Sequence, residues 1–389
     1  MFSHGKSVYR NPFADCRKPN CRYFAFAKRP ADKKRRNGLI PFYLYSLVGK
    51  KLAVLLSGGI DSSVVTYLVK KENPDAKVVA FTLLLYGNEK DLENAQKVCQ
   101  FLGIPCKVLD LRKPFRERVI SYFLNEYRKG RTPNPCAVCN WEIKLGLAVD
   151  ILTEQGFEKI YTGHYVRKVN FLGYTTLARP KDRGKDQSYF LALLKPERLK
   201  YLEFPLGDFT KEEVRQIAKE VNLPTKSRKE SQDICFLEGQ KLKDFLLQHF
   251  PPEEGVFLYK GKVVGRHQGY FTYTIGQRRG LGLRLGKPVY VIGIDAKTNT
   301  VFVGDKEELL TRRVNLVGVN CFIPLREIQR LKLWGQIRYR TPAKEVEKLE
   351  ETPEGLKVTF KQPFSGVAKG QIGALYLDNE ILACGGVIS

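Results

Sequence analysis

Strands and helices alternate along the first half of this chain, and that alternation limits the fold more than any other feature of the sequence. Short apolar runs such as KLAVLL (51–56) and KVVAFTLLLY (77–86) have the character of buried strands, and each is followed by a segment with helical periodicity. Parallel strands need such crossovers, because the chain must return to the same end of the sheet before the next strand begins. The sequence therefore predicts a doubly wound parallel α/β sheet.

The residue pattern of the chain changes after about residue 240. Glycines there separate short apolar runs, which is typical of β-rich domains with tight turns. The first 49 residues differ again, since they are basic and nearly free of acidic residues. We predict four parts: a basic N-terminal extension (1–49), an α/β domain (50–240), a small central β-rich domain (241–308) and a C-terminal β-barrel domain (309–389).

The excess of basic residues indicates a polyanionic partner. The 389 residues include 66 Lys and Arg against 41 Asp and Glu, a net charge of +25. A surplus of that size favours nucleic acid, and the alternative is the solvated surface of a lysine-rich proteome. Nine cysteines, scattered and odd in number, favour a reducing compartment, so we expect a cytoplasmic protein. No apolar run reaches the roughly 20 residues of a membrane helix, and we expect no membrane contact.

The stretch SGGIDSS (57–63) follows a predicted strand and opens a predicted helix. Gly58 and Gly59 permit a sharp turn, while free N–H groups and the nearby serine hydroxyls can bind an anion. The pattern lacks the lysine of a Walker loop. Its serine-rich form resembles the pyrophosphate loop (PP-loop) of the N-type ATP pyrophosphatases, which cleave ATP between the α and β phosphates and adenylate a substrate oxygen. The alternative is a plain strand–turn–helix with a serine cap.

Two cysteines lie in GRTPNPCAVCNWEIK (130–144), which we predict to be a stiff loop between two helices, because each of its two prolines fixes φ. Cys136 and Cys139 are thereby held in place for an incoming substrate. A third cysteine, Cys235, follows far along the chain in SQDICFLEG (231–239). A thiolate is strongly nucleophilic near neutral pH, so such thiols can displace a group that adenylation has activated.

Six motifs occur in the order found in one enzyme family. With them, the chain resembles the tRNA-specific 2-thiouridylases (the MnmA family) from about residue 50 to its C-terminus. The motifs are SGGIDSS (57–63), GRTPNPCAVCN (130–140), TGHY (162–165), KDQSYFL (185–191), SQDICF (231–236) and YTIGQRRGLG (273–282).

This resemblance implies ATP-dependent 2-thiolation of the wobble uridine of tRNA by a tRNA-uridine 2-sulfurtransferase. ATP would adenylate the uracil 2-oxygen, a persulfide on Cys235 would attack carbon 2, and Cys139 would release the sulfur, leaving a Cys139–Cys235 disulfide. The cofactors would be ATP and Mg²⁺, with Asp61 as a Mg²⁺ ligand or only a helix cap. The partners would be a tRNA with a modifiable wobble uridine and a sulfur donor such as a cysteine desulfurase or relay protein.

The same resemblance assigns binding residues, and it gives the central domain to tRNA binding. We expect His164 to be a structural hydrogen-bonding residue rather than a base. The positions implied for ATP are Leu55, Leu56, Ser57, Gly58, Gly59, Ile60, Asp61, Ser62, Thr82 and Gly163. The positions implied for tRNA are Asn134, Pro135, Cys136, Lys185, Asp186, Gln187, Arg338 and Tyr339.

Cys136 departs from the pattern of family members that carry aspartate at this position. With three cysteines, the chain could instead hold a four-iron four-sulfur cluster through Cys136, Cys139 and Cys235, with the fourth iron open to hydrosulfide. A structural zinc that lacks one ligand, or an inert extra thiol, are the further alternatives. Two other functions stay open: a PP-loop ATP pyrophosphatase acting on a small molecule, and a non-catalytic tRNA-binding protein.

The remaining cysteines of residues 50–389 are predicted to be core residues. Cys99 and Cys106 adjoin apolar helical and strand runs, and Cys321 and Cys384 lie in β-rich runs.

Overall fold

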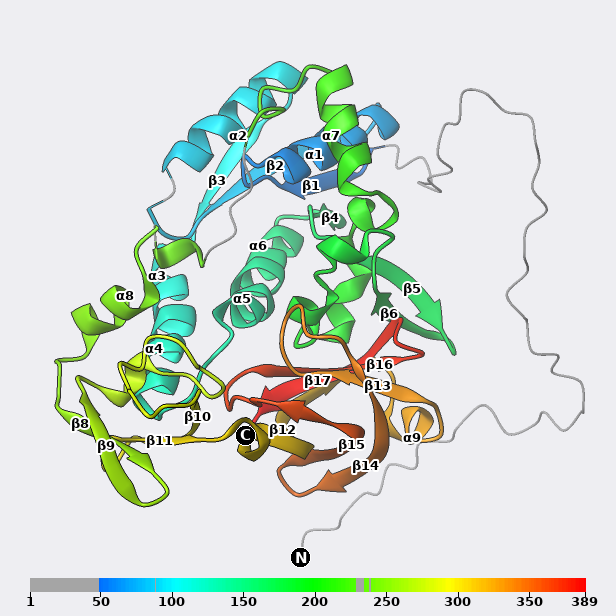
Figure 1. The fold of residues 1–389 in the computed structure, drawn as a ribbon. Helices are drawn as coiled ribbons and strands as arrows, with labels where there is room; N and C mark the ends of the chain where they lie inside the picture. Colours follow the sequence, from blue (N-terminus) through cyan, green and yellow to red (C-terminus); the bar gives the residue numbers. More distant parts are fainter. Residues whose placement is uncertain (1–48, 88, 229–233, 238) are drawn as a thin grey trace, which may run out of the picture. The chain divides into compact units, whose positions relative to one another are not determined.

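A five-stranded parallel sheet forms the first part of the molecule (Figure 1). The computed structural model describes residues 49–87, 89–228, 234–237 and 239–389, so the predicted N-terminal extension lies outside the described residues apart from Gly49. Every strand pair in the sheet is parallel, in the order β3-β2-β1-β4-β7, which confirms the predicted α/β fold. The strands are β1 (Lys51–Leu55), β2 (Lys77–Leu84), β3 (Cys106–Asp110), β4 (Lys159–Tyr161) and β7 (Leu202–Glu203).

Helices cover both faces of this sheet. Strand β1 buries Leu52, Ala53 and Val54 in succession, as a parallel strand does when both of its faces are covered. Within the described residues, no helix has the length and apolar character needed to span a membrane. One face carries α1 (Ile60–Glu72), α2 (Glu89–Leu102) and α7 (Lys211–Glu220), and the other carries α6 (Ala148–Glu154).

Two longer helical segments each contain a π-helical stretch. The prediction of a stiff loop over 130–144 is wrong for most of that stretch, because a helix begins at Pro135. Asn134 caps this helix, and its side-chain oxygen accepts the N–H of Ala137 at 3.0 Å, while proline at the first helical position has a suitable φ. The segments are α3 (Arg112–Phe115), η1 (Arg116–Ile120) and α4 (Ser121–Arg128), then α5 (Pro135–Cys139), η2 (Asn140–Leu147) and α6.

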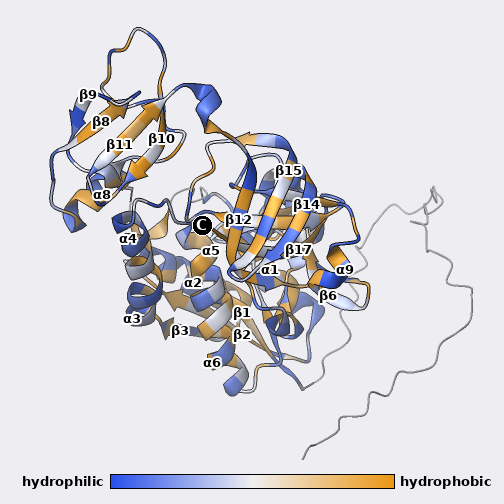
Figure 2. Cartoon of the chain, turned by 90° about the horizontal axis from the view of Figure 1, so that it is seen from below, coloured by the Kyte–Doolittle hydropathy of each residue, from blue (hydrophilic) through white to orange (hydrophobic). Residues whose placement is uncertain are grey.

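A four-stranded sheet with its own core follows α8 (Leu242–His249). Its order is β10-β11-β8-β9, with β8 and β11 parallel and the other pairs antiparallel. Phe257, Val291 and Val301 fill its core, and Figure 2 shows the hydrophobic residues along these strands. The strands are β8 (Gly255–Tyr259), β9 (Lys262–His267), β10 (Tyr290–Asp295) and β11 (Thr300–Gly304).

The last part of the chain closes into a six-stranded barrel, which confirms the predicted C-terminal β-barrel. The order β12-β15-β14-β13-β16-β17 is closed by pairing between β12 and β17. A short helix, α9 (Leu325–Ile328), follows the first strand. The strands are β12 (Leu310–Cys321), β13 (Leu333–Gln336), β14 (Lys344–Thr352), β15 (Gly355–Ser365), β16 (Ile372–Leu377) and β17 (Ile381–Ile388).

A hairpin from the first half of the chain extends the barrel sheet. Its strands are β5 (Arg167–Phe171) and β6 (Tyr174–Ala178), and β6 pairs with β17 through Leu177 and Leu382. One core cluster consequently contains side chains of both the parallel sheet and the barrel.

Cys321 and Cys384 form a disulfide between β12 and β17. The prediction that they lie in the core is correct for Cys384, which is fully buried, whereas Cys321 is half-buried. Their bonding did not follow from the sequence, because 63 residues separate them and only the strand register brings them together.

Candidate active site

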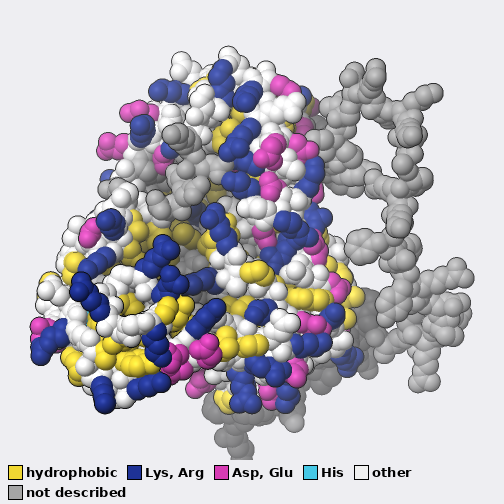
Figure 3. Space-filling view, in the orientation of Figure 1, with side chains coloured by type: hydrophobic (Ala, Val, Ile, Leu, Met, Phe, Trp, Pro, Cys, Tyr) yellow, Lys and Arg dark blue, Asp and Glu magenta, His cyan; other side chains and the backbone are white. Residues whose placement is uncertain are grey.

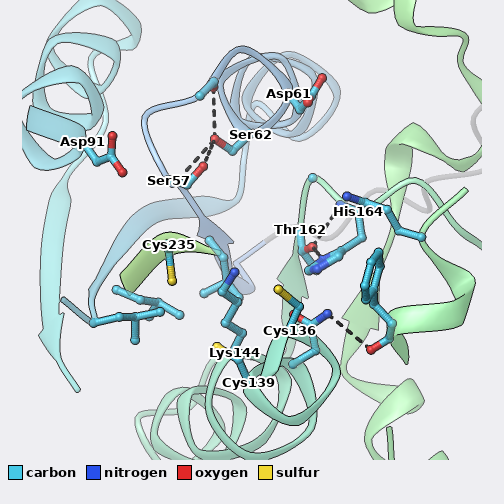
Figure 4. Close-up of a pocket in the computed structure, with 18 of the residues that line it drawn as sticks. Ser57, Asp61, Ser62, Asp91, Cys136, Cys139, Lys144, Thr162, His164 and Cys235 are labelled. Carbon is cyan, nitrogen blue, oxygen red and sulfur yellow. Dashed lines mark hydrogen bonds between the residues drawn. The ribbon is translucent and has the colours of Figure 1, made fainter. Parts of the chain in front are cut away.

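A cavity of about 1100 Å³ opens at the carboxyl ends of β1, β2 and β4. Ligands of open α/β sheets bind at this edge, because the loops that follow the strands meet there. Four segments far apart in the sequence form much of its wall: the loop before α1, the first turn of α5, residues 162–165 and the segment of Cys235 (Figure 4). Tyr339 and Arg340, which follow β13, complete it from the barrel side.

The loop between β1 and α1 is held by its own serines. The N–H of Ser57 donates to the Ser62 hydroxyl at 3.2 Å, and the two hydroxyl oxygens are 3.1 Å apart. The hydroxyls of Ser62 and Ser63 also donate to the carbonyl of Gly59, at 3.1 and 2.7 Å. These bonds keep the loop open toward the cavity at a helix N-terminus, where N–H groups favour an anion.

Glycines are required where this loop meets its neighbours. Gly58 has φ +71°, and a side chain there would meet the carbonyl oxygen of Asp91 at 2.3 Å. Gly163 approaches the same loop from β4, and a Cβ there would lie 3.1 Å from the backbone nitrogen of Ser62. The two contacts fix the loop between α2 and the TGHY segment.

Asp61 is held by two side chains at the start of α1. Its Oδ1 accepts from the ammonium of Lys211 at 2.6 Å and from the hydroxyl of Tyr165 at 2.8 Å. The side chain of Lys211 is only 2% exposed. A buried ammonium needs such a carboxylate. The ion pair between Lys211 and Asp61 therefore acts as a clamp that holds α7 against α1.

Cys136 and Cys139 lie on the first turn of α5, three positions apart and thus on one side of the helix. Cys139 is 5% exposed, and burial raises the pKa of its thiol to about 12. Cys136 is open to the cavity on one side and surrounded by protein on the others, so burial raises the pKa of its thiol as well. Lys144 opposes both shifts.

Cys235 reaches the cavity because the next residue is anchored in the core. Phe236 is 1% exposed and packs edge-on against Phe115 and Phe123, with ring centroids 6.1 and 5.1 Å apart. Cys235 itself is exposed and lines the same cavity as the other two cysteines.

Lys144 lies between these thiols (Figure 4). Burial alone would lower the pKa of its ammonium, but the thiols of Cys139, Cys235 and Cys136 favour the charged form, and the net effect raises that pKa. His164 is affected in the opposite way, since burial and the charge of Lys144 lower its pKa to about 3. The imidazole hydrogen-bonds the Thr162 hydroxyl.

Three family models match successive parts of the chain. The tRNA methyl transferase HUP domain matches residues 50–239, the tRNA methyl transferase PRC-barrel domain matches 243–305, and the aminomethyltransferase beta-barrel domain matches 316–388.

Relatives match the chain over nearly their whole length. The tRNA-specific 2-thiouridylase MnmA of Aquifex aeolicus (strain VF5) is 42% identical over 355 residues, covering 87% of this chain and 98% of that protein. The protein of the same name from Helicobacter pylori (strain ATCC 700392 / 26695) is 42% identical over 350 residues, covering 87% and 99%. This chain belongs to the tRNA-specific 2-thiouridylase (MnmA) family. Among solved structures, the U34-tRNA thiolase NcsA from Methanococcus maripaludis with its 4Fe-4S cluster has a TM-score of 0.34 at 21% identity, covering 52% of this chain and 67% of NcsA.

Most of the residues that the MnmA resemblance predicted for ATP line the cavity. Thr82 does not: it is buried behind the loop, where its hydroxyl donates to the carbonyl of Leu56 at 3.0 Å. Gly58 contributes to the shape of the loop rather than to the cavity wall. The lining residues of this set are Leu55, Leu56, Ser57, Gly59, Ile60, Asp61, Ser62 and Gly163.

The residues predicted for catalysis and for tRNA divide into two groups. The side chains of Asn134 and Asp186 bind other residues of the protein. Asn134 caps α5, and Asp186 forms an ion pair with Arg179. Arg338 is exposed and lies outside the cavity wall. The members that line the cavity are Cys139, Cys235, Pro135, Cys136, Lys185, Gln187 and Tyr339.

The wall also contains residues that were not predicted for the MnmA site, among them Lys144, Phe190, Arg228 and Arg340. Lys144 and Arg340 lie close to predicted motif residues. From the sequence, however, a basic side chain in the cavity wall cannot be distinguished from one that faces solvent. Phe190 belongs to the quoted motif KDQSYFL, whereas Arg228 lies outside the six motifs and reaches the cavity only through the fold. The Phe190 ring stacks at 4.4 Å from that of Tyr339, so the barrel and the α/β part meet at the wall.

Proposed function

We propose that this chain catalyses ATP-dependent 2-thiolation of the wobble uridine of tRNA. One observation carries the proposal: the serine loop, the two cysteines of α5 and Cys235 line one cavity. The names of its relatives and the net charge of +25 support tRNA as the substrate. Figure 3 shows Lys and Arg side chains spread over the face seen in Figure 1, as phosphate contacts require.

The first step activates the uracil. Its 2-oxygen attacks the α-phosphorus of ATP while N3 releases its proton to water. The bond from that phosphorus to the bridging oxygen breaks, and pyrophosphate leaves with the electron pair. The N–H groups and hydroxyls of the serine loop hold the phosphates. For ATP we propose Leu55, Leu56, Ser57, Gly58, Gly59, Ile60, Asp61, Ser62 and Gly163, with Thr82 supporting the loop from behind.

Magnesium would reach this site with the ATP phosphates rather than on a carboxylate side chain. In the described part of the cavity wall the two carboxylates are both ion-paired, Asp61 with Lys211 and Asp91 with Arg228. The ion would offset phosphate charge when bound. The clamp formed by Asp61 keeps the helix start in position for the nucleotide.

The second stage transfers sulfur. The Cys235 thiolate attacks the outer sulfur of a donor persulfide, the S–S bond of the donor breaks, and the donor leaves as a thiolate. The terminal sulfur of the Cys235 persulfide then attacks carbon 2 of the uracil while AMP leaves. The Cys139 thiolate then attacks the sulfur of Cys235, the bond to the transferred sulfur breaks, and C2=S forms as N3 regains its proton. An external dithiol supplies two electrons to reduce the resulting Cys139–Cys235 disulfide.

A four-iron four-sulfur cluster is the alternative use of the same thiols. The described residues contain no set of three His, Cys, Asp or Glu side chains that converges on a metal position, so the thiols as they lie do not fit a cluster. We derive no step through one. Anaerobic purification followed by iron and sulfide analysis separates the routes: about four irons per chain, lost on mutation of Cys136, would overturn the persulfide route.

The tRNA contacts that we propose extend from the cysteines along the cavity wall toward the barrel. Lys185, Gln187 and Tyr339 face the cavity beside the cysteines, where a flipped base would stack on an aromatic ring. We propose contacts at Arg338 outside the wall, with Asn134 and Asp186 supporting the contact surface. We also propose the division 50–240, 241–308 and 309–389, which the ranges of the three family models support.

The decisive experiment combines tRNA, ATP, a persulfide donor and the purified chain, and measures both 2-thiouridine and AMP. Cys235→Ala should reduce 2-thiouridine to background while AMP release continues in part, because the thiol acts after adenylation. Cys99→Ala, a buried cysteine of α2 outside the cavity, is the matched control. Wild-type thiolation by Cys235→Ala would refute the assignment.

The same assay tests the two rival functions. A PP-loop enzyme for a small molecule would release AMP without thiolating tRNA. A non-catalytic tRNA-binding protein would bind tRNA with or without ATP and release no AMP.

A further inference from the structure

The serine loop has no positively charged side chain of its own. Residues 57–63 contain neither lysine nor arginine, whereas a Walker loop supplies a lysine to the phosphates. Adenylation nevertheless places new negative charge on the departing pyrophosphate, and preorganised positive charge at that point lowers the barrier. A cation is therefore expected from elsewhere in the cavity wall.

Arg228 is placed to supply it. This residue follows α7 in the sequence and lines the same cavity as Ser57 and Ser62. One guanidinium nitrogen donates to the carbonyl of Gly58 at 2.6 Å, and another pairs with the carboxylate of Asp91. Its side chain is 25% exposed, so it is held in the wall rather than free in solvent.

The contacts of Arg228 leave donors for a ligand. A guanidinium carries five N–H donors, and within the described residues only Gly58 and Asp91 accept from it. Those two residues lie where the loop packs on α2, since a Cβ at Gly58 would be 2.3 Å from the Asp91 carbonyl oxygen. The guanidinium is thus fixed against the loop itself.

Other cations of the wall have other neighbours. Lys144 lies among the cysteines, and Arg340 lies over the ring of Tyr339. Lys211, which does not line the cavity, is committed to Asp61. Lys90 lines the cavity near Asp91 but is exposed to solvent. Only Arg228, among the described cations, is bonded to the loop backbone.

We propose that Arg228 binds the β- and γ-phosphates of ATP and stabilises pyrophosphate as it leaves. This inference rests on the adenylation step proposed above. As the oxygen–phosphorus bond to uracil forms and the bond to the bridging oxygen breaks, the electron pair moves onto pyrophosphate, and the planar guanidinium accepts that charge with paired N–H donors. Asp91 orients the guanidinium from its other side.

Binding of inorganic pyrophosphate to the full chain tests this without tRNA. Calorimetry should show Arg228→Met weakening pyrophosphate binding about 10- to 100-fold, the usual effect of losing hydrogen bonds to a charged group, with AMP binding unchanged within about 2-fold. Arg228→Lys should recover part of the loss. Arg112→Met removes an arginine that pairs with Asp110 on the surface outside the cavity, and should change neither ligand.

The unmodified chain provides a second measurement, because Arg228→Met also removes the hydrogen bond to the loop carbonyl of Gly58. Phenylglyoxal modifies accessible arginines, and peptide mapping should show that pyrophosphate, but not AMP, protects Arg228 while Arg112 reacts equally in all samples. Pyrophosphate affinity within about 2-fold of wild type in Arg228→Met, equal losses for AMP and pyrophosphate, or absence of protection would overturn the inference. A chain that shows the pyrophosphate effects but never thiolates tRNA would refute the proposed function and leave this role standing.

Discussion

Lys144, in the wall of the cavity, and Lys211, which pairs with the wall residue Asp61, show two ways of holding a lysine near this site. The ammonium of Lys211 is paired with Asp61, as a buried charge normally is. Lys144 has no hydrogen bond or ion pair to any residue that the structure describes, and its titratable neighbours include three thiols. Because the interaction is mutual, the ammonium favours the thiolate form of those cysteines, which is the reactive one.

Replacing Lys144 should therefore slow the reaction of the thiols. Without the ammonium, the pKa of Cys136 rises further, so less thiolate is present at a given pH and the alkylation curve moves to higher pH. Lys144→Met should reduce the rate of iodoacetamide alkylation of Cys136 at pH 7.5 about 10-fold, one pKa unit being a modest effect for a nearby opposite charge. Mass spectrometry of the alkylated peptide measures the rate between pH 6 and 10.

Two further variants control this result. Lys144→Arg keeps the charge and should keep the wild-type profile, and Lys97→Met removes an exposed lysine of α2 and should have no effect. An unshifted profile in Lys144→Met would mean that this lysine does not act on the thiols.

Single residues also show how much of the site can be predicted from the sequence. The serine loop could be predicted locally, because its glycines and serines constrain the backbone. The joint use of the three cysteines was predicted only through the resemblance to the MnmA family, because Cys235 is remote from the other two in the sequence. Lys144, Arg228 and Arg340 could not, since an isolated basic residue has the same pattern whether it faces solvent or a cavity. Thr82 was predicted to line the ATP pocket but supports the loop from behind, a difference that depends on packing.

The start of α5 decides where two of the thiols lie. The sequence TPNPC gives the signals of a turn, and these are also the signals of a helix start, since asparagine is a good N-cap and proline fits the first helical position. The structure uses them as a helix start. The η2 stretch then continues the helix with wider π turns, which place Lys144 beside Cys139, five residues earlier.

Loss of this cap should affect both stability and sulfur transfer. Asn134→Ala removes the hydrogen bond to the N–H of Ala137, so we expect the free energy of unfolding to fall by about 1 kcal/mol. Because the first turn carries Cys136 and Cys139, 2-thiouridine formation should fall more than AMP release. Urea unfolding and the two product assays measure these effects.

The conservative variant separates capping from tRNA contact. Asn134→Asp keeps the cap and should restore the stability that Asn134→Ala loses. If Asn134→Ala proved as stable as wild type, the cap would not be what fixes the thiols.

The alternation of strands and helices could be predicted, apart from the helix that begins at Pro135, but the long-range pairing of the strands could not. Alternating strands and helices led to the parallel sheet, and glycine-punctuated runs led to the barrel. The β5–β6 hairpin pairs with β17 about 200 residues away, and no local pattern encodes such a register. The same pairing brings Arg167 and Arg183 to Glu380, beside the loop that carries Lys185.

At the scale of the whole molecule, charge should dominate tRNA binding. Residues 1–48 hold 11 Lys and Arg against 2 Asp and Glu, so residues 49–389 alone keep a net charge of +16 out of the total of +25. Figure 3 shows basic side chains over the face seen in Figure 1. Each phosphate that such a side chain neutralises releases a counterion from the RNA.

The affinity for tRNA should consequently fall steeply with salt in the full chain and in a chain that starts at residue 49. With six or more phosphate contacts, the dissociation constant should rise about 1000-fold between 50 and 200 mM KCl, measured by filter binding. The shorter chain should keep a steep slope because most of its charge remains, whereas AMP binding, which needs one phosphate site, should change little. A flat salt response in both chains would mean that the described basic face does not carry the tRNA, and a flat response in the shorter chain alone would assign that task to residues 1–48.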